Sequence, residues 1–229
     1  MLKSPKPLFL FDIDGTLLSK AGPHHRHALE YAAGLAAGKP VSTDGVPLAG
    51  MLDRDILRLM LSQAGVSDKR IAQWMPSIVV EAQRHYPKIC PDLRHRVCPG
   101  MRAFLSKLRR RDIAAGLVTG NLSRIGWHKM HQAGLRSFFR FGAFAEMGRT
   151  RTELAAKAID QARRLKLCSV EAKVFLVGDH LNDIRAAREN QISIISVSTG
   201  PMSRQELSAF SPDFLLDNIR DLPLEIIET

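Results

Sequence analysis

Short apolar runs that alternate with longer amphipathic runs are the feature that most constrains the fold of this chain. Strand-like runs occupy residues 8–11, 114–118, 174–177 and 192–197, and a weaker candidate lies at 141–145. Helical spacing of apolar residues appears at 101–110, 122–133, 153–165, 182–190 and 203–209. Because strands that alternate with helices form parallel sheets with helices on their faces, the pattern predicts an α/β fold.

The stretch 19–96 interrupts this alternation. Helix-like pieces at 25–37, 54–64 and 68–84 fill it, and Pro76 is expected to kink or split the last of them. Turn signals mark both ends, Gly-Pro at 22–23 and Cys-Pro-Gly at 98–100. We therefore predict a core of residues 1–18 and 97–229 with an all-helical insert of residues 19–96.

A polar cluster follows the first predicted strand and reads DIDGT at 12–16. The side chains of Asp12 and Asp14 point to the same side, facing the crevice where ligands bind in open α/β sheets. Two carboxylates this close repel each other unless a cation or a shared proton relieves them, and Mg²⁺ suits carboxylate oxygens. The alternative is a strand-end turn at Gly15.

Two further clusters follow later strands. The segment Thr119, Gly120 and Asn121 offers a hydroxyl and backbone N–H groups to an anion, or Asn121 merely caps the next helix. In GDHLND at 178–183, Asp179 and Asp183 lie close together if a helix starts near residue 180, or they are only favourable acids in a first helical turn. A parallel sheet would bring all three clusters to one edge.

The clusters DIDGT, TGN and GDHLND resemble the motifs of the haloacid dehalogenase-like superfamily of phosphatases. The layout is similar to the phosphoglycolate phosphatase and β-phosphoglucomutase branch, in which a helical cap follows the first motif. The resemblance covers nearly the whole chain. It implies a Rossmann-like parallel sheet as the catalytic core and an insert that serves as a cap domain.

The resemblance implies a magnesium-dependent phosphohydrolase that acts on a small phosphorylated metabolite. Asp12 would attack phosphorus and form an aspartyl-phosphate, and Asp14 would protonate the leaving oxygen and then activate water. Mg²⁺ would bind Asp12, the backbone carbonyl of Asp14 and Asp179, with Asp183 supporting its shell. The phosphate would be held by Gly15, Thr119, Gly120 and Asn121.

A basic residue completes the phosphate site of the family, and here the sequence departs from the usual lysine. The stretch before the helix reads GRTRTEL at 148–154. Arg151 is our candidate because it lies just before the helix, with Arg149 and Lys157 as alternatives. Arginine can hold phosphate bidentately but is not equivalent to lysine.

In related enzymes a cap loop helps to select the substrate, and residues 50–55 are the candidate loop here. Arg54 could meet an acidic substrate, or a helix starts here with Asp53 as its N-cap and Arg54 in solvent. We interpret His24, His25 and His27 as a polar helix start, because unpaired histidines at this spacing rarely close a coordination shell.

The amino-acid composition limits the classes of partner and the cellular compartment that we expect. The chain carries 33 basic and 23 acidic residues, a net charge of +10, but no interleaved aromatic residues of the kind that single strands stack on. We expect no nucleic-acid partner, and the apolar runs are too short to span a membrane. Three cysteines without a CxxC pair indicate a reducing cytoplasm. The expected partner is a small-molecule phosphoester, and a monomer and a homodimer both stay open.

Three other functions compete with hydrolysis. A sugar phosphomutase shares the aspartyl-phosphate but must exclude water while the phosphate returns to the sugar. A 2-haloacid dehalogenase needs neither a metal nor an acid for a phosphoester, so Asp14 and Asp179 disfavour it. A non-catalytic phosphate-binding or regulatory module would keep the fold without turnover.

Overall fold

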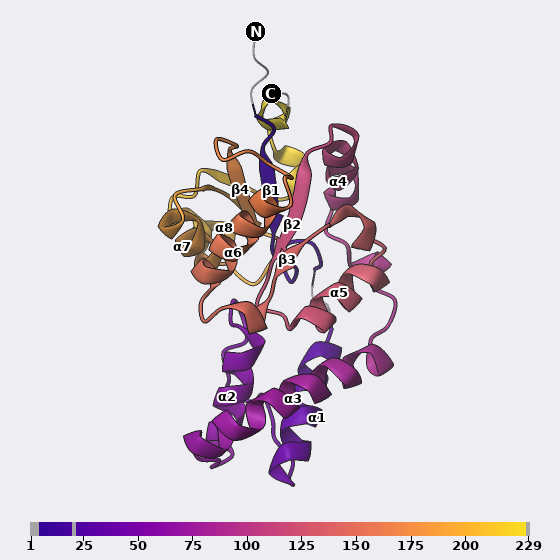
Figure 1. Cartoon of the computed structure of the whole chain (residues 1–229), viewed down its shortest axis with the longest axis vertical. Helices are drawn as coiled ribbons and strands as arrows, with labels where there is room; N and C mark the ends of the chain where they lie inside the picture. Colours follow the sequence, from indigo (N-terminus) through magenta and orange to yellow (C-terminus); the bar gives the residue numbers. More distant parts are fainter. Residues whose placement is uncertain (1–4, 20–21, 228–229) are drawn as a thin grey trace.

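The computed structural model describes residues 5–19 and 22–227 (Figure 1). Residues 1–4 and 228–229 of the predicted core and 20–21 of the predicted insert lie outside this description. Within the described residues, six parallel strands form one sheet in the order β3-β2-β1-β4-β5-β6. The strands are β1 (Leu8–Phe11), β2 (Ala114–Val118), β3 (Gly142–Ala143), β4 (Val174–Gly178), β5 (Ser193–Val197) and β6 (Phe214–Leu216).

β1 takes a central place because its side chains are apolar on both faces, as expected for a strand of a covered parallel sheet. Leu8 lies opposite Ala114 on β2 and opposite Val174 on β4. The residue after the strand, Asp12, donates its backbone N–H to Val177 O at 3.0 Å. The first acidic residue therefore stands at the carboxyl end of the sheet, between β2 and β4.

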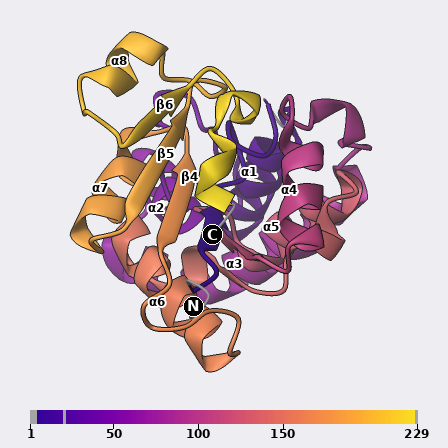
Figure 2. The same ribbon diagram turned by 90° about the horizontal axis from the view of Figure 1, so that it is seen from above.

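Helices cover both faces of the sheet. α6 and α7 pack against each other and against β2, β3, β4 and β5, while α4 packs against β2. The ring of Phe104 on α4 contacts the rings of Phe9 and Phe11. Figure 2 shows α6 and α7 on one side of the sheet and α4 and α5 on the other. The helices of the core are α4 (Met101–Arg110), α5 (Ser123–Gln132), α6 (Arg151–Arg164), α7 (Leu181–Glu189) and α8 (Arg204–Ser208).

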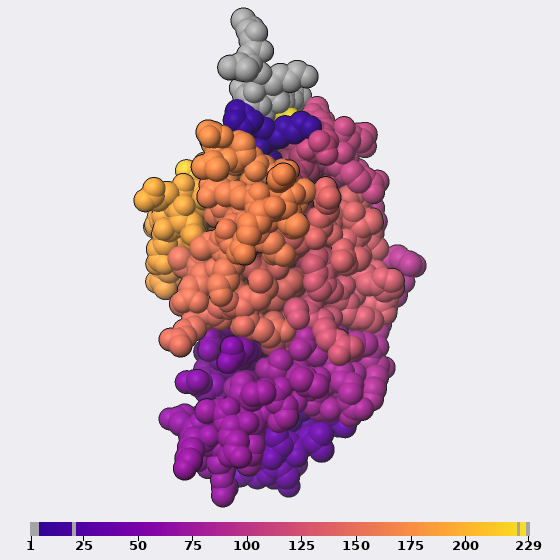
Figure 3. All heavy atoms as spheres, in the orientation of Figure 1, coloured from indigo at the N-terminus to yellow at the C-terminus, as the bar shows by residue number. Residues whose placement is uncertain are grey.

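The insert consists of α1 (His24–Ala37), α2 (Asp53–Gln63) and α3 (Asp68–Ile89), which lie beyond the carboxyl ends of the strands (Figure 1). In the space-filling view the insert packs directly against the core (Figure 3). α3 continues through Pro76 and Pro87, so the expectation that Pro76 splits it is wrong. The buried stripe of α3 runs past Pro76 on both sides and holds the two halves in one helix; its residues are Ile71, Met75, Ile78, Ala82, Gln83 and Tyr86.

The two connections between core and insert run side by side. Leu18 forms an antiparallel bridge with Val97, and Ser19 N donates to Arg96 O at 2.8 Å. These contacts lie at the boundaries that the sequence predicts for the insert.

Two features of the sheet edges differ from the sequence pattern. β6 has no counterpart among the predicted strands, because it is only three residues long and two of them are half-buried. The weak candidate at 141–145 shortens to the two residues of β3. Ser203 and Glu206 do form a capping box at the start of α8. Among the described helices, none is both long and apolar enough to cross a membrane.

Candidate active site

Three buried carboxylates converge at the carboxyl ends of β1 and β4. Asp12 follows β1, Asp179 follows β4, and Asp183 lies in the first turn of α7. One side-chain oxygen of each residue lies within 4.8 Å of the others. The residues are 5%, 2% and 0% exposed, respectively. They meet because β1 and β4 are hydrogen-bonded neighbours in the sheet.

Arg151, at the first position of α6, supplies a cation to this cluster. Its Nη1 donates to Asp12 Oδ1 at 2.8 Å and to Val118 O at 3.1 Å. Its Nε lies 3.4 Å from Asp183 Oδ1. Thr150 Oγ1 caps the helix by accepting from Glu153 N at 3.1 Å, so α6 begins at the residue that faces the sheet.

The two alternative basic residues lie outside this cluster. Arg149 is exposed, and Lys157 is exposed with its Nζ donating to Met147 O. Arg151 is 6% exposed and lines the cavity beside Asp12. Position therefore favours Arg151.

Burial and mutual repulsion disturb the ionisation of the acidic residues. Burial, together with the charges of Asp12 and Asp183, raises the pKa of Asp179 well above its usual value. Burial raises the pKa of Asp183 to about 7 against the opposing charge of Arg151, and the charge of Asp12 adds to the rise. Asp179 and Asp183 therefore need more positive charge than Arg151 offers before both of them ionise.

The donor set fits a hard divalent cation. Asp183 Oδ1 is buried without a hydrogen-bond partner among the described residues. Thr16 Oγ1 donates to Asp179 Oδ1 at 2.8 Å, which leaves Asp179 Oδ2 for another partner. A Cβ atom on Gly15 or Gly200 would come within 2.1 or 1.8 Å of that oxygen, so glycines keep the space beside it clear. Carboxylate oxygens of this kind are the ligands that Mg²⁺ prefers.

Asp14 lies at the edge of the same cluster, and the core holds its carboxylate. Lys129 Nζ donates to Oδ1 at 2.8 Å and to Oδ2 at 2.6 Å, and Asn121 Nδ2 donates to Oδ2 at 2.8 Å. The side chain of Asp14 stays 36% exposed. Although burial by itself raises the pKa of Asp14, the charge of Lys129 and the hydrogen bonds from Lys129 and Asn121 bring it below its usual value.

The predicted turn at Gly15 is present, and it stands beside the cavity. Gly15 has φ +89°, a left-handed conformation that favours glycine, and its N–H donates to Leu18 O at 2.7 Å. Gly15 also lines the cavity between Asp14 and Asp179. The turn is thus what sets the two aspartates of the first motif around the cavity.

Residues 119–121 follow β2 beside the cluster. Thr119 is fully buried, and its Oγ1 accepts from Asn121 N at 3.3 Å and from Asn121 Nδ2 at 3.1 Å. Gly120 and Asn121 line the cavity. The N-cap of α5 is Leu122, so the alternative of a helix cap by Asn121 is wrong. Asp183, by contrast, both faces Arg151 and forms a capping box with His180.

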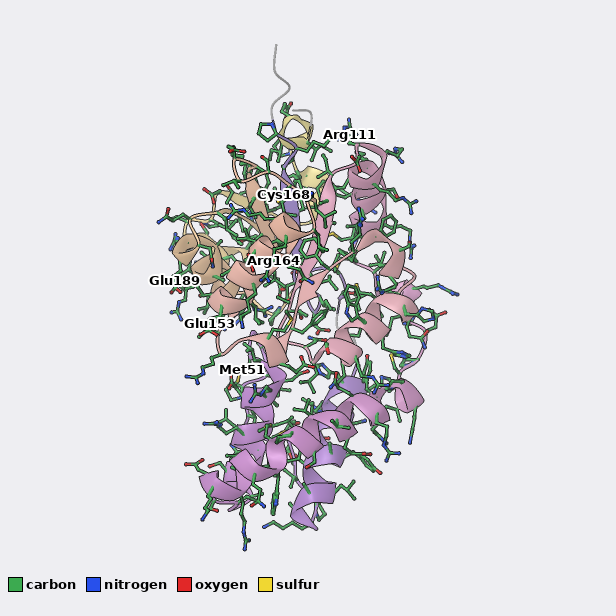
Figure 4. The ribbon with its side chains drawn as sticks, viewed as in Figure 1. Met51, Arg111, Glu153, Arg164, Cys168 and Glu189 are labelled. Atoms are coloured by element: carbon green, nitrogen blue, oxygen red, sulfur yellow. The ribbon has the colours of Figure 1, made fainter. Side chains whose placement is uncertain are left out.

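A cavity of about 330 Å³ lies between the core and the insert, with the acidic cluster on one wall. The insert contributes Arg26, Leu29, Leu48 and Ile56 to the opposite wall. Met51 lies where the loop before α2 meets the core (Figure 4). This loop is fixed by Asn182 Nδ2, which donates to Gly50 O at 2.9 Å.

Arg54 does not reach this cavity. It is exposed on α2, and the described residues that line the cavity include Arg26 but not Arg54. The expectation that Arg54 binds the substrate is therefore unsupported by its position. α2 begins at Asp53 with Leu52 as its N-cap, so Asp53 is not the cap either.

Three residues that the sequence analysis did not assign to the site belong to its wall: Lys129, His25 and Asp53. The interpretation of His25 as part of a polar helix start was incomplete, because its ring turns inward between Lys129 and Asp53. A signal for Lys129 was available in the sequence. The helical spacing of Ile125, Gly126, Lys129 and Met130 puts a lysine on the buried face of α5.

Comparisons with known proteins match the part of the chain that contains these motifs. A model of the haloacid dehalogenase-like hydrolases matches residues 7–190 of the chain. A phosphoglycolate phosphatase from Synechococcus elongatus is 27% identical over 218 residues, which is 93% of each chain. A phosphoglycolate phosphatase from Pseudomonas savastanoi is 26% identical and covers 96% of this chain and 79% of its own length.

Solved structures share the fold at lower identity. A β-phosphoglucomutase from Clostridium difficile superposes with a TM-score of 0.70 at 17% identity, over 97% of this chain and 96% of its own. A predicted phosphoglycolate phosphatase from Haemophilus somnus gives a TM-score of 0.66 at 16% identity, over 94% and 96%. These likenesses establish a shared fold over nearly the whole chain.

Proposed function

We propose that this chain, which belongs to the haloacid dehalogenase-like hydrolase family, is a phosphatase that uses Asp12 as a covalent nucleophile on a small phosphorylated metabolite. The observation that supports this most is the 2.8 Å contact between Arg151 and Asp12, beside two further carboxylates on a cavity wall. A guanidinium there orients the nucleophile and can also bind phosphate oxygens.

In the first half of the reaction, an oxygen of Asp12 attacks phosphorus and the bond from phosphorus to the leaving oxygen breaks. Asp14, held by Lys129 and Asn121, transfers a proton to the leaving oxygen. The products are the free alcohol and an aspartyl-phosphate on Asp12.

In the second half, water attacks the phosphorus of the aspartyl-phosphate and gives its proton to the Asp14 carboxylate. The hydrogen bonds from Lys129 and Asn121 favour this carboxylate form. The bond from phosphorus to the Asp12 oxygen breaks, inorganic phosphate leaves, and Asp14 keeps the proton that it transfers in the next turnover.

We assign the Mg²⁺ ligands to Asp12, the backbone carbonyl of Asp14 and Asp179, with Asp183 supporting the shell. When bound, Mg²⁺ supplies the positive charge that offsets repulsion between the carboxylate nucleophile and the phosphate. Support comes from the buried acidic cluster and from Asp183 Oδ1, which accepts no hydrogen bond from a described group although Arg151 Nε lies 3.4 Å away.

The phosphate itself is assigned to Arg151 and to the segment Gly120-Asn121, with Gly15 on the facing side of the cavity. Thr119 contributes by accepting two hydrogen bonds from Asn121, which fixes the peptide of that segment. These groups supply the N–H donors that an anion needs at the start of a helix.

A phosphatase is favoured over a sugar phosphomutase. Curated relatives at 25–27% identity are named phosphoglycolate phosphatases. The β-phosphoglucomutase likeness lies at 17% identity and bears on the fold alone. Phosphoglycolate is therefore the first metabolite to test, and the reducing cytoplasm is the compartment that we assign from the cysteine pattern.

The test is hydrolysis of p-nitrophenyl phosphate with Mg²⁺ and then with excess EDTA, followed by hydrolysis of 2-phosphoglycolate. We expect turnover that EDTA abolishes and that Asp12→Asn lacks. Asp160→Asn, an exposed aspartate on α6, is the matched control and should keep wild-type rates. Full activity in Asp12→Asn would refute the covalent role. Tight binding of a phosphate analogue without turnover of any phosphoester would indicate a binding module.

A further inference from the structure

Lys129 is a lysine with no exposed surface, although charged side chains are seldom fully buried. It projects from α5 of the core, and its ammonium contacts both oxygens of Asp14. Its third contact is His25 Nδ1 at 3.1 Å, on α1 of the insert. The lysine therefore joins the proposed acid–base residue to a helix of the insert.

The donors and acceptors around His25 follow from the ammonium of Lys129, and the network converges on Asp53 as its acceptor. Because the ammonium of Lys129 can only donate, His25 Nδ1 is the acceptor and His25 Nε2 carries the proton. Nε2 then donates to Asp53 Oδ2 at 2.9 Å, and that oxygen also accepts from Leu122 N at 2.7 Å. This hydrogen-bond network starts at Asp14 in the core, passes through one residue of α1 and one of α2 in the insert, and ends at the backbone of the core.

The burial of Lys129 depends on this crossing. His25 and Asp53 come from the insert, and the backbone N–H of Asp53 donates to Gly120 O at 2.8 Å in the same contact zone. If the insert moves away, Lys129 loses its third partner and the Leu122 N–H loses its acceptor. The hydrogen-bond partners of Lys129 thus come from both the core and the insert.

We propose that Lys129 is a positioning residue that couples docking of the insert to the placement of the Asp14 carboxylate, through the chain Lys129–His25–Asp53–Leu122. Its role in catalysis rests on the phosphatase activity proposed above. With the insert docked, Lys129 and Asn121 hold Asp14 in one orientation. With the insert displaced, Lys129 is free to turn and Asp14 loses that orientation.

The first test measures docking without any substrate, by amide hydrogen exchange in the full chain. The reporters are the amides of Leu122 and Asp53, whose acceptors lie across the interface. We expect Lys129→Ala and His25→Ala each to raise exchange at both amides by about tenfold or more, since a buried charged hydrogen-bond network opens. Lys69→Ala, at an exposed lysine of α3, is the control and should leave both amides unchanged.

The second test separates positioning from a structural effect, using p-nitrophenyl phosphate. Lys129 does not touch the substrate in this proposal, so Lys129→Ala should lower kcat roughly 100-fold, within the range of general acid–base catalysis, and change KM less than about threefold. Methylammonium should restore part of the kcat of Lys129→Ala by replacing the lost cation. Methanol at the same concentration should restore none.

Two results would overturn the inference. One is unchanged exchange at Leu122 and Asp53 in Lys129→Ala. The other is a Lys129→Ala variant whose kcat equals that of the wild type, or whose reduced kcat rises no more with methylammonium than with methanol. Because the exchange experiment needs no turnover, it tests docking of the insert independently of the proposed phosphatase activity. A wild-type protein that hydrolyses no phosphoester refutes the phosphatase, and with it the catalytic part of this inference, while the docking part is decided by exchange.

Discussion

Arg151 Nη1 lies 2.8 Å from Asp12 Oδ1 although 139 positions separate the two residues in the chain. The guanidinium also reaches toward Asp183, so one side chain links two of the three clustered carboxylates. Because the guanidinium offsets negative charge on buried carboxylates, this pairing stabilises the acidic cluster.

Replacing Arg151 should therefore affect both activity and stability. Arg151→Met leaves buried carboxylates unpaired, and we expect a loss of roughly 3–5 kcal/mol in the free energy of unfolding in EDTA. We also expect kcat/KM to fall by roughly 100-fold or more, because a cation at the reacting phosphate is lost. Arg151→Lys should keep part of both. Urea denaturation and p-nitrophenyl phosphate kinetics measure them, with the exposed Arg149→Met as the control; equal effects in both methionine variants would contradict the assignment.

The acidic cluster also predicts a pH dependence of stability in the absence of metal. The pKa of Asp183 is raised to about 7, so between its unfolded value near 4 and that pH the folded state holds a proton that the unfolded chain has released. The free energy of unfolding should then fall as pH rises through this window. In EDTA, Tm should drop more from about pH 5 to about pH 7.5 in the wild type than in Asp183→Asn. Added Mg²⁺ should raise Tm more at the higher pH. A parallel decline in both proteins would argue against Asp183 as the source.

Substitution of Gly120 tests how closely the insert must pack against the core. A Cβ atom at this position would lie 2.2 Å from Met51 O, a backbone atom that cannot turn aside. We expect Gly120→Ala to lower kcat/KM at least about tenfold by holding the insert away, while thermal stability changes little because the clash is relieved by displacement. Hydrogen exchange at Asp53 should rise in the variant. Ser62→Ala, on the exposed face of α2, is the comparison, and wild-type kinetics in Gly120→Ala would show that the insert can dock without this contact.

Arg26 is the arginine that the described part of the insert presents to the cavity, and it offers a test of substrate selection. If the leaving group carries a carboxylate, as in 2-phosphoglycolate, Arg26→Ala should raise KM for that substrate roughly tenfold through loss of a charge-assisted hydrogen bond. KM for p-nitrophenyl phosphate should stay nearly unchanged. Arg54→Ala supplies the matched control, since Arg54 is exposed on α2 outside the cavity. Equal shifts for both substrates would mean that Arg26 does not read the leaving group.

The elements of the core could be predicted because their signals are local. The runs that became β1 and β2 keep their predicted bounds, since a strand buried on both faces is apolar throughout. Asp12 and Asp179 could be brought together from sequence because each directly follows a strand. β6 could not be predicted, because a strand of three residues, two of them only partly buried, produces no periodicity.

The insert side of the site was less predictable, because it depends on how two domains meet. Arg54 and Arg26 are both arginines on amphipathic helices, and only the docking angle decides which one faces the cavity. His25 was interpreted as part of a polar helix start for the same reason. Lys129 was missed as well, although its position among the buried residues of α5 was a signal in the sequence for an internal partner.

The bridge between Leu18 and Val97 affects how such a protein can evolve. Because the entry and exit of the insert are neighbours, the ends of any replacement segment need only be close together, and a longer segment costs little more in loop-closure entropy. The core that carries Asp12 and Arg151 would keep the register of its sheet through such an exchange. Selection of the leaving group and transfer of the phosphoryl group can therefore evolve as separate modules on one polypeptide.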